Sequence, residues 1–322
     1  MRVIRDTNFD FIGRRKQAFF LSIAIIVLGG VSMASRGGIR VGVDFTGGVQ
    51  IEVGIDAASG QAADIARVRD AVAAAGYDNR NIQQVGGGGE NFFLIHVQTT
   101  SEGLEVSGQE ASADSLTTSQ RILGAIADEF AGQTVDLRSV ESVGPKIGGE
   151  LQLAAIQAVL LAMLLVVAYV AWRFEFRFGV ATLAAVAHDV LLTLGLFSLF
   201  NKELTLSIVA ALLTLVGYSV NDTIVVFDRI REEIKRKQRR ESTEAIFNTG
   251  INKTLSRTIL TSLTTIFVVG ALFVYGGAVI HDFTWVLLVG IIVGTYSSIF
   301  VAAPLVIEWQ KRAEIKEAQR AA

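Results

Sequence analysis

The sequence predicts an α-helical membrane protein with six transmembrane helices and one extracytoplasmic α+β domain, of ferredoxin-like βαββαβ order, between helices 1 and 2. Of its 322 residues, 51% are hydrophobic and only 19% are charged, which does not suit a soluble globular protein. The apolar residues form long blocks, and one long polar region separates the first block from the others. The predicted parts are an N-terminus with helix 1 (1–35), the polar domain (36–150), a five-helix bundle with a basic cytoplasmic loop at 228–257 (151–307), and a cytoplasmic tail (308–322).

Six blocks are long enough to cross a bilayer, which takes about 20 residues at roughly 1.5 Å each. The first block is short, and we expect its helix to extend to Gln17 and Ser35. The blocks are Phe19–Met33, Leu151–Ala171, Phe178–Phe200, Leu204–Phe227, Thr258–Gly276 and Phe283–Ile307.

The distribution of basic residues predicts the orientation of the chain in the membrane. Five precede the first block, two lie in the turn 173–177, nine lie in 228–257, and four follow the last block, whereas the alternate loops hold one between them. The positive-inside rule then places both termini in the cytoplasm and the polar domain outside. A cleaved signal peptide is the alternative for the N-terminus, and it gives the same orientation.

The polar region has the pattern of a small folded domain. Residues with period-two alternation predict strands, and residues with helical spacing predict two helices. A glycine tract, Gly86–Gly89, indicates a hairpin, and Thr99–Ser112 is expected to be a mobile loop. In chain order the expected elements are strand Val49–Gly54, helix Ala62–Ala75, strands Asn81–Val85 and Phe92–Gln98, helix Ser115–Ala131 and strand Thr134–Val143.

Two glycine-rich segments join this domain to the spans, Val41–Gly48 and Glu141–Leu151. Glycine permits tight reversals, so both are candidate hinges, with ordinary turns as the alternative. The first lacks the Lys-Ser/Thr ending of a nucleotide-binding loop. The candidate hinge residues are Gly42, Gly47, Gly48, Gly144, Pro145, Gly148 and Gly149.

Asp222 is the only ionisable residue inside the fourth block after its first residues. A carboxylate at the centre of a span costs about 2.5–3.5 kcal/mol even on insertion scales, and such residues usually face a polar interior and move protons, ions or substrate. Tyr218 and Ser219 precede it by four and three residues, on the same helical face. Asp222 is therefore the main candidate for a moving charge.

Arg257 lies just before the fifth block, in one stripe with Thr261, Thr264 and Thr265. Because lipid offers no hydrogen-bond partners, we expect this stripe to face Asp222. Arg257 would favour the ionised carboxylate and burial the protonated one, so the pair is a candidate proton site. A static salt bridge, or an arginine whose head lies in water at the end of its span, remains open.

His188 and Asp189 form a second costly pair near the middle of the third block. Imidazole titrates near physiological pH, so the pair is either a relay element or a hydrogen-bonded contact between helices. Gly290, Gly294 and Ser298 indicate helix packing. The run 228–240 is expected to be an amphipathic helix against the inner leaflet.

The sequence predicts no enzyme. It has no cysteine, so disulfides, thiolate metal sites and thiol nucleophiles are excluded. Two aspartates in separate spans suggest an intramembrane aspartyl protease, but residues 219–222 are Ser-Val-Asn-Asp in place of the usual GxGD. No cofactor, metal or nucleic acid is expected, and protons are the expected coupling ion.

Five segments together resemble the SecD/SecF family of the bacterial Sec protein-export machinery, part of the resistance-nodulation-division superfamily. They are VGVDFTGG at 41–48, SVGPKIGGEL at 142–151, AHDV at 187–190, GYSVNDTIVVFDRIREE at 217–233 and TLSRTILTSLTT at 254–265. The resemblance implies six spans around a ferredoxin-like domain. It also implies that the proton-path aspartate of the family is Asp222 and its essential arginine is Arg257.

The resemblance further implies a heterodimer with SecD, which supplies a second carboxylate, beside the SecYEG channel, with YajC and YidC as further partners. Such a complex uses the proton-motive force to pull unfolded preproteins across the membrane. Two rivals stay open from the residues: a proton-coupled transporter of small molecules or lipids with the same architecture, and a passive scaffold of the translocon.

Overall fold

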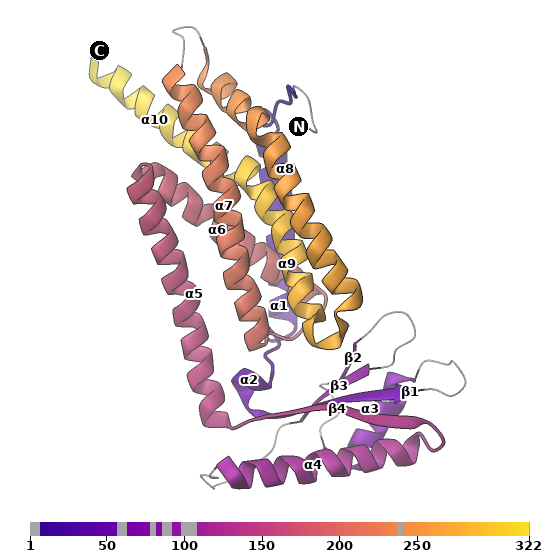
Figure 1. Cartoon of the computed structure of the whole chain (residues 1–322). Coiled ribbons are helices and arrows are strands. Elements are labelled where there is room, and N and C mark those ends of the chain that lie inside the picture. Colours follow the sequence, from indigo (N-terminus) through magenta and orange to yellow (C-terminus); the bar gives the residue numbers. More distant parts are fainter. Residues whose placement is uncertain are drawn as a thin grey trace.

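The computed structural model of the chain describes residues 7–56, 63–77, 82–85, 92–97, 108–236 and 241–321. A long helical bundle stands on a small α+β domain, and both ends of the chain lie at the end of the bundle away from that domain (Figure 1). Because the helices α7 (Leu206–Arg236) and α8 (Thr243–Tyr275) also meet at that end, the basic segments gather with the termini, as the charge pattern predicts.

The described residues contain six helices long and apolar enough to cross a membrane, which confirms the six predicted spans. The last span is continuous through a short π-helical segment, η1 (Ser298–Ala302), which precedes Pro304. Proline lacks an N–H and disturbs the helical ladder before it, which accounts for the altered turn. The helices are α1 (Arg15–Ser35), α5 (Pro145–Arg173), α6 (Phe176–Leu199), α7 (Leu206–Arg236), α8 (Thr243–Tyr275), α9 (Gly277–Ser297) and α10 (Ala303–Ala321).

The expected basic loop at 228–257 is largely helical instead. Helix α7 continues to Arg236 and α8 begins at Thr243, where the Ser242 hydroxyl accepts from the Ala245 N–H as an N-cap. Glu233 forms an ion pair with Arg229 of its own helix and another with Lys253 of α8, and the second pair joins the two helices beyond the apolar part of the bundle. This charged layer explains why the helices persist there.

The domain has the predicted ferredoxin-like order. Its four strands form one antiparallel sheet of order β2-β3-β1-β4. The expected mobile loop is helical from residue 108, while 98–107 and the glycine tract lie outside the described residues. The elements are β1 (Gly48–Asp56), α3 (Ile65–Ala74), β2 (Ile82–Val85), β3 (Phe92–Val97), α4 (Gly108–Glu129) and β4 (Thr134–Val143).

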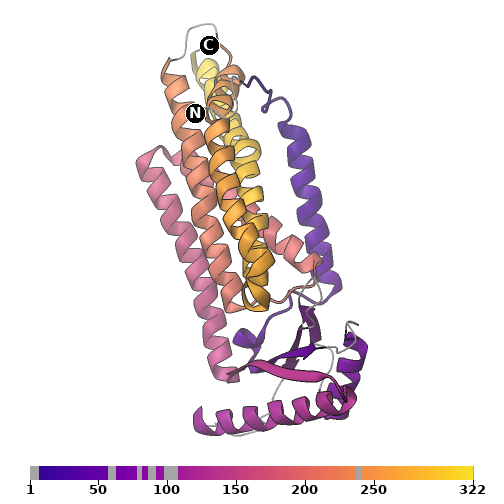
Figure 2. The ribbon, with the colours of Figure 1, turned by 45° about the vertical axis from the view of Figure 1, so that its right-hand side comes forward.

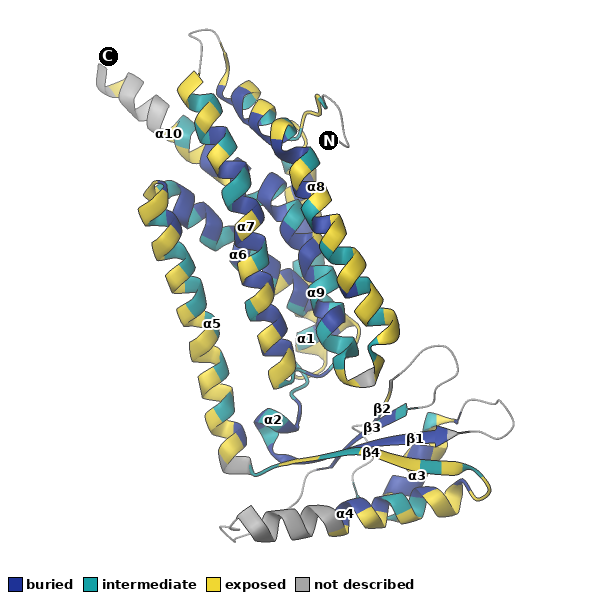
Figure 3. Cartoon of the chain, in the orientation of Figure 1, coloured by how far each residue is buried: buried dark blue, intermediate teal, exposed yellow. Residues whose placement is uncertain are grey.

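Alternation along β1 separates the two faces of this sheet. Ile51, Val53 and Ile55 are buried against α3 and α4, which cover the face away from the bundle (Figures 1 and 3). Glu52 lies on the other face and is also buried. The carboxylate of Glu203, in the α6–α7 loop, lies 3.6 Å from the ring of His96 on β3. The domain therefore packs on the bundle by a polar face.

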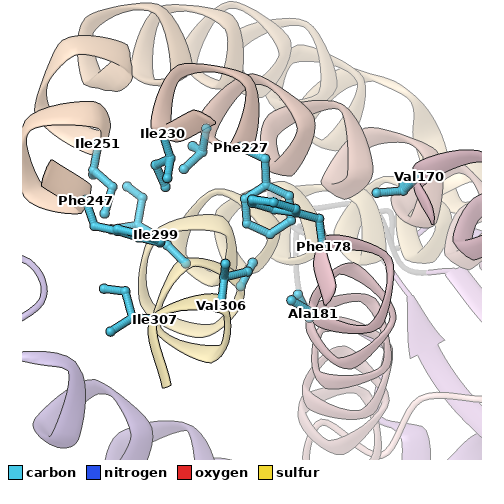
Figure 4. Packing of buried hydrophobic residues seen from close by; sticks show 14 of the residues in the cluster. Val170, Phe178, Ala181, Phe227, Ile230, Phe247, Ile251, Ile299, Val306 and Ile307 are labelled. Atoms are coloured by element: carbon cyan, nitrogen blue, oxygen red, sulfur yellow. The ribbon is translucent and has the colours of Figure 1, made fainter. Parts of the chain in front are cut away.

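The bundle core forms where α5, α6, α7, α8 and α10 converge. Phe178 and Phe227 stack edge to face with ring centroids 4.9 Å apart, surrounded by aliphatic side chains (Figure 4). Helix α1 crosses α6 at Gly29 and Gly195, so closely that a Cβ on Gly29 would lie 2.4 Å from the Cα of Gly195. Helix α5 stands at the edge of the bundle (Figure 2), and its surface is largely apolar and exposed.

The first glycine-rich segment is tied to the bundle. It contains a short helix, α2 (Val43–Thr46), and the Gly42 N–H donates to the Leu204 carbonyl at 2.8 Å. The Asp44 carboxylate accepts from the Leu206 N–H at the start of α7 (2.6 Å). Gly47 and Gly48 have φ of +74° and +129°, which favours glycine. This segment is thus a short helix held between domain and bundle.

The second segment is the start of α5. Pro145 is its first residue, and Gly144 precedes it in extended backbone. A Cβ on Gly148 would lie 2.9 Å from the Phe45 carbonyl oxygen, so α5 packs directly on α2, whereas Gly149 faces open space. Gly42 and Gly148 are thus close-packing positions in this conformation.

The N-terminal residues 7–14 lie across α8. The Asn252 side chain bonds both the N–H and the carbonyl of Phe9 at 2.9 Å, and the Asn248 oxygen accepts from the N–H groups of Phe11 and Ile12. Hydrogen bonds from the Gly13 N–H and from Asn248 hold the pKa of Asp10 below its usual range. The N-terminal segment 7–14 thus fixes the start of α1 to α8.

Candidate functional site

Two carboxylates are buried in the centre of the bundle. Asp189 on α6 and Asp222 on α7 are only 1% and 2% exposed. Both face neighbouring helices, as the cost of an ionisable group in lipid requires. The predicted placement of Asp222 in a polar interior therefore holds.

Asp222 is held by hydroxyl groups. Oδ2 lies 3.3 Å from the Ser262 hydroxyl of α8 and 3.3 Å from the Thr295 hydroxyl of α9, and those two hydroxyls lie 2.7 Å from each other. Each hydroxyl can donate to the carboxylate or accept from a carboxyl O–H. Three helices thus meet at one titratable group.

Asp189 has a similar environment. Its Oδ2 accepts from Ser219 of α7 at 2.5 Å and from Ser297 of α9 at 2.7 Å. Its Oδ1 lies 2.8 Å from His188 Nδ1, so the predicted His–Asp contact is formed. The geometry alone fits both a relay and a static contact.

Close packing of α7 on α9 brings the two sites together. A Cβ on Gly294 would lie 3.1 Å from the Ser219 Cβ, and one on Gly290 would lie 2.6 Å from Leu215. The small residues predicted for helix packing therefore let α9 approach α7. As a result, Thr295 reaches Asp222 and Ser297 reaches Asp189.

The predicted pairing of Asp222 with Arg257 is not a direct contact. Arg257 is exposed on α8 and forms no ion pair with Asp222, on which its charge acts only at longer range. Arg257 precedes Ser262 by five residues on α8, which is about 7.5 Å along the helix axis. Because α8 continues past it in both directions, Arg257 is not at the end of a helix.

Of the predicted stripe Thr261, Thr264 and Thr265, only Thr265 contacts the face of α7 that carries Asp222. The hydroxyls of Thr261 and Thr264 bond to carbonyls of their own helix, and Thr265 accepts from the Tyr218 hydroxyl at 3.2 Å. The buried polar stripe is Thr254, Thr258 and Ser262, one residue out of phase. One residue turns a helix by about 100°, so the neighbouring face meets α7.

Sequence reasoning missed Ser262, Thr295 and Ser297. The available signal was weak: hydroxyl residues at positions 258 and 262 share a face, and 295–298 is a polar run inside an apolar span. Among the described residues, no group of three or more metal-ligating side chains occurs. The arrangement suits proton chemistry, since protonation removes the charge of a buried carboxylate while the hydroxyls satisfy both forms.

The model of the SecD/SecF protein-export membrane protein C-terminal family matches residues 124–312. The chain is 38% identical over 307 residues to a protein translocase subunit SecF of Gemmatimonas aurantiaca, covering 95% of this chain and 89% of that protein. It is 44% identical to the SecF subunit of Magnetococcus marinus, over 94% and 93% of the two chains. The chain belongs to the SecD/SecF family.

A solved structure agrees with this membership. The crystal structure of SecDF, a translocon-associated membrane protein from Thermus thermophilus, matches with a TM-score of 0.77 and 34% identity, over 95% of this chain. SecDF in its super-membrane-facing form matches with a TM-score of 0.66 and 35% identity, over 98% of this chain. The chain spans 39% and 41% of those two SecDF chains. A SecD/SecF protein with six candidate spans is a multi-pass membrane protein.

Proposed function

We propose that the chain is the SecF-type subunit that works with SecD and uses the proton-motive force to drive late steps of preprotein export across the cytoplasmic membrane. Family membership and the names of the relatives support the export role. The observation that carries the energy coupling is Asp222, buried at the junction of α7, α8 and α9 among neutral hydroxyls.

A proton on Asp222 changes the contacts of three helices. The ionised carboxylate accepts from Ser262 and Thr295, whereas the protonated group donates one bond and must turn one hydroxyl around. Entry of one proton releases about 2.3 kcal/mol per 100 mV and about 1.4 kcal/mol per pH unit. That energy suffices to change the packing of α7 against α8 and α9.

The connection from α7 to the domain supports a mechanical role. The start of α7 is held by Asp44, and the adjoining loop is held by Gly42. Helix α5 packs on the same short helix α2 through Gly148. A shift of α7 is therefore passed to the domain through Gly42, Gly47 and Gly48, and through Gly144 to Gly149 at α5.

Arg257 supports the proposed partnership with SecD. An exposed guanidinium within a span is costly unless it is paired. In the proposed complex it faces a carboxylate of SecD, so that the proton path spans the interface of the two subunits. SecYEG, YajC and YidC are the further partners, the unfolded preprotein is the substrate, and both termini lie in the cytoplasm.

The experiment uses membrane vesicles with the complete SecD-containing complex and a preprotein stalled late in export. Asp222→Asn is expected to abolish stimulation by the proton-motive force while leaving assembly intact. Asp228→Asn, an exposed position on the same helix, is the matched control and is expected to export normally.

Two outcomes would overturn the proposal. Full stimulation with assembled Asp222→Asn would indicate a passive scaffold. Purification of the native complex without SecD or the translocon, but with an outer channel or adaptor, would indicate a transporter of small molecules or lipids.

A further inference from the structure

Asp189 is buried as deeply as Asp222 and has no role in the mechanism above. Its contacts are Ser219 of α7, Ser297 of α9, and His188 beside it on its own helix, α6. A carboxylate that only packed helices together would be replaceable by an uncharged group at lower cost. Its position therefore calls for a function.

The two carboxylates lie at similar depth. Helices α7 and α9 run in the same direction, because Gly290 lies against Leu215 and Gly294 against Ser219. Ser219, which bonds Asp189, precedes Asp222 by three residues on α7, whereas Ser297, which also bonds Asp189, follows Thr295 by two residues on α9. Asp189 and Asp222 are thus neighbours across α7 and α9.

Groups able to pass a proton surround both carboxylates. Ser219 shares one face of α7 with Asp222, and Ser262 and Thr295 complete the surroundings of Asp222. Hydroxyls donate and accept at once, and the one-turn gap between Ser219 and Asp222 is the span of a single water. The hydroxyls of Thr223 and Thr258 are buried without a partner among the described residues, which leaves polar atoms for such a water.

His188 is placed to supply the proton. Its Nδ1 contacts Asp189, while its Nε2 is buried and has no hydrogen-bond partner among the described residues. The ring lies 6.3 Å from the ring of Tyr296, whose hydroxyl donates to the Ala18 carbonyl and contacts Ser22 of α1. Nε2 is therefore the ring nitrogen at which we expect a proton to arrive.

We propose that Asp189 is a second proton-carrying site, loaded from His188 and emptied to Asp222. The imidazolium of His188 gives its Nδ1 proton to Oδ1 of Asp189. Because Ser219 lies on Oδ2, the protonated carboxyl turns to present its O–H to the Ser219 hydroxyl, which releases its own proton through one water to Asp222. His188 ends neutral, Asp189 ionised and Asp222 neutral, so charge and protons balance. This inference rests on the proposed function.

The test compares variants in the SecD-containing complex reconstituted in liposomes. Asp189→Asn and, independently, Ser219→Ala are expected to lower proton flux at least about tenfold. Thr193→Val is the control, because Thr193 is buried one turn away on α6 and its hydroxyl has no described partner. Asp189→Glu is expected to restore part of the flux.

Infrared titration separates a relay from a static contact. The carboxyl bands of the wild-type complex are expected to titrate in two coupled steps, and Asp189→Asn should remove one and shift the midpoint of the other. Wild-type flux in Asp189→Asn, or an unmoved midpoint for Asp222, would overturn the relay. If Asp189→Asn does not assemble, Ser219→Ala with Ser297→Ala decides by the same criteria.

The two proposals fail differently. Flux lost in Asp222→Asn but retained in Asp189→Asn would refute the relay alone. Flux retained in both would refute the proposed function as well.

Discussion

At the scale of single residues, hydroxyls surround both buried carboxylates. Asp222 lies against Ser262 and Thr295, and Asp189 against Ser219 and Ser297. That Asp222 matters follows from the sequence, because one acid in an apolar span is costly wherever it faces. The partners of Asp222 cannot be predicted in this way, because helix packing, and not spacing along the chain, decides which side chains of other helices lie beside it.

Glu52 gives a pH prediction. Burial raises the pKa of Glu52, and the nearby Arg138 offsets part of that effect. The folded domain then binds more protons than the unfolded chain, so its stability falls as pH rises through the raised pKa. Glu52→Gln should therefore stabilise the sheet at neutral pH and flatten its pH dependence.

Hydrogen exchange of the β1, β3 and β4 amides in the full chain measures this effect. At pH 8 the variant should exchange severalfold more slowly than the wild type, after correction for intrinsic rates. Asp128→Asn, an exposed position on α4, is the control. Faster exchange in Glu52→Gln at pH 8 would contradict the assignment.

At the scale of elements, the faces of α8 were the hardest to predict. The helix is apolar nearly all round and bears threonine or serine on several faces, so periodicity does not distinguish its buried side. Steric fit decides instead, with Ser262 facing α7 and α9. Thr261 and Thr264 were consequently assigned to the wrong face, one residue out of phase with Thr258 and Ser262.

The start of α7 gives a prediction at this scale. Asp44 satisfies the Leu206 N–H, a group that would otherwise lack a partner at the helix terminus. Asp44→Ala should cost about 1 kcal/mol, in line with the loss of a helix cap. The Leu206 amide should then exchange about fivefold faster.

Asp44→Asn keeps an acceptor oxygen and should retain most of the protection. Unchanged exchange at Leu206 in Asp44→Ala would show that this contact does not anchor α7. The comparison thus tests the link through which the domain is coupled to the bundle.

At the scale of the whole molecule, hydropathy and charge predicted six spans, and alternating patterns predicted the ferredoxin-like domain. Both are confirmed, since burial and strand pairing follow directly from local periodicity. The contact of the N-terminal segment 7–14 with Asn248 and Asn252 was not predictable. It depends on segments more than 230 residues apart, which no local pattern connects.

In the proposed mechanism, a proton on Asp222 shifts α7 and, through α7, the domain. Direct proton flux tests it best. Liposomes that contain the SecD-bearing complex and an enclosed pH-sensitive dye should show proton entry under an imposed gradient. Wild type and Asp228→Asn should give the same flux, and Asp222→Asn should fall to the leak of protein-free liposomes. Wild-type flux through Asp222→Asn would contradict the role of Asp222 as the proton-carrying group.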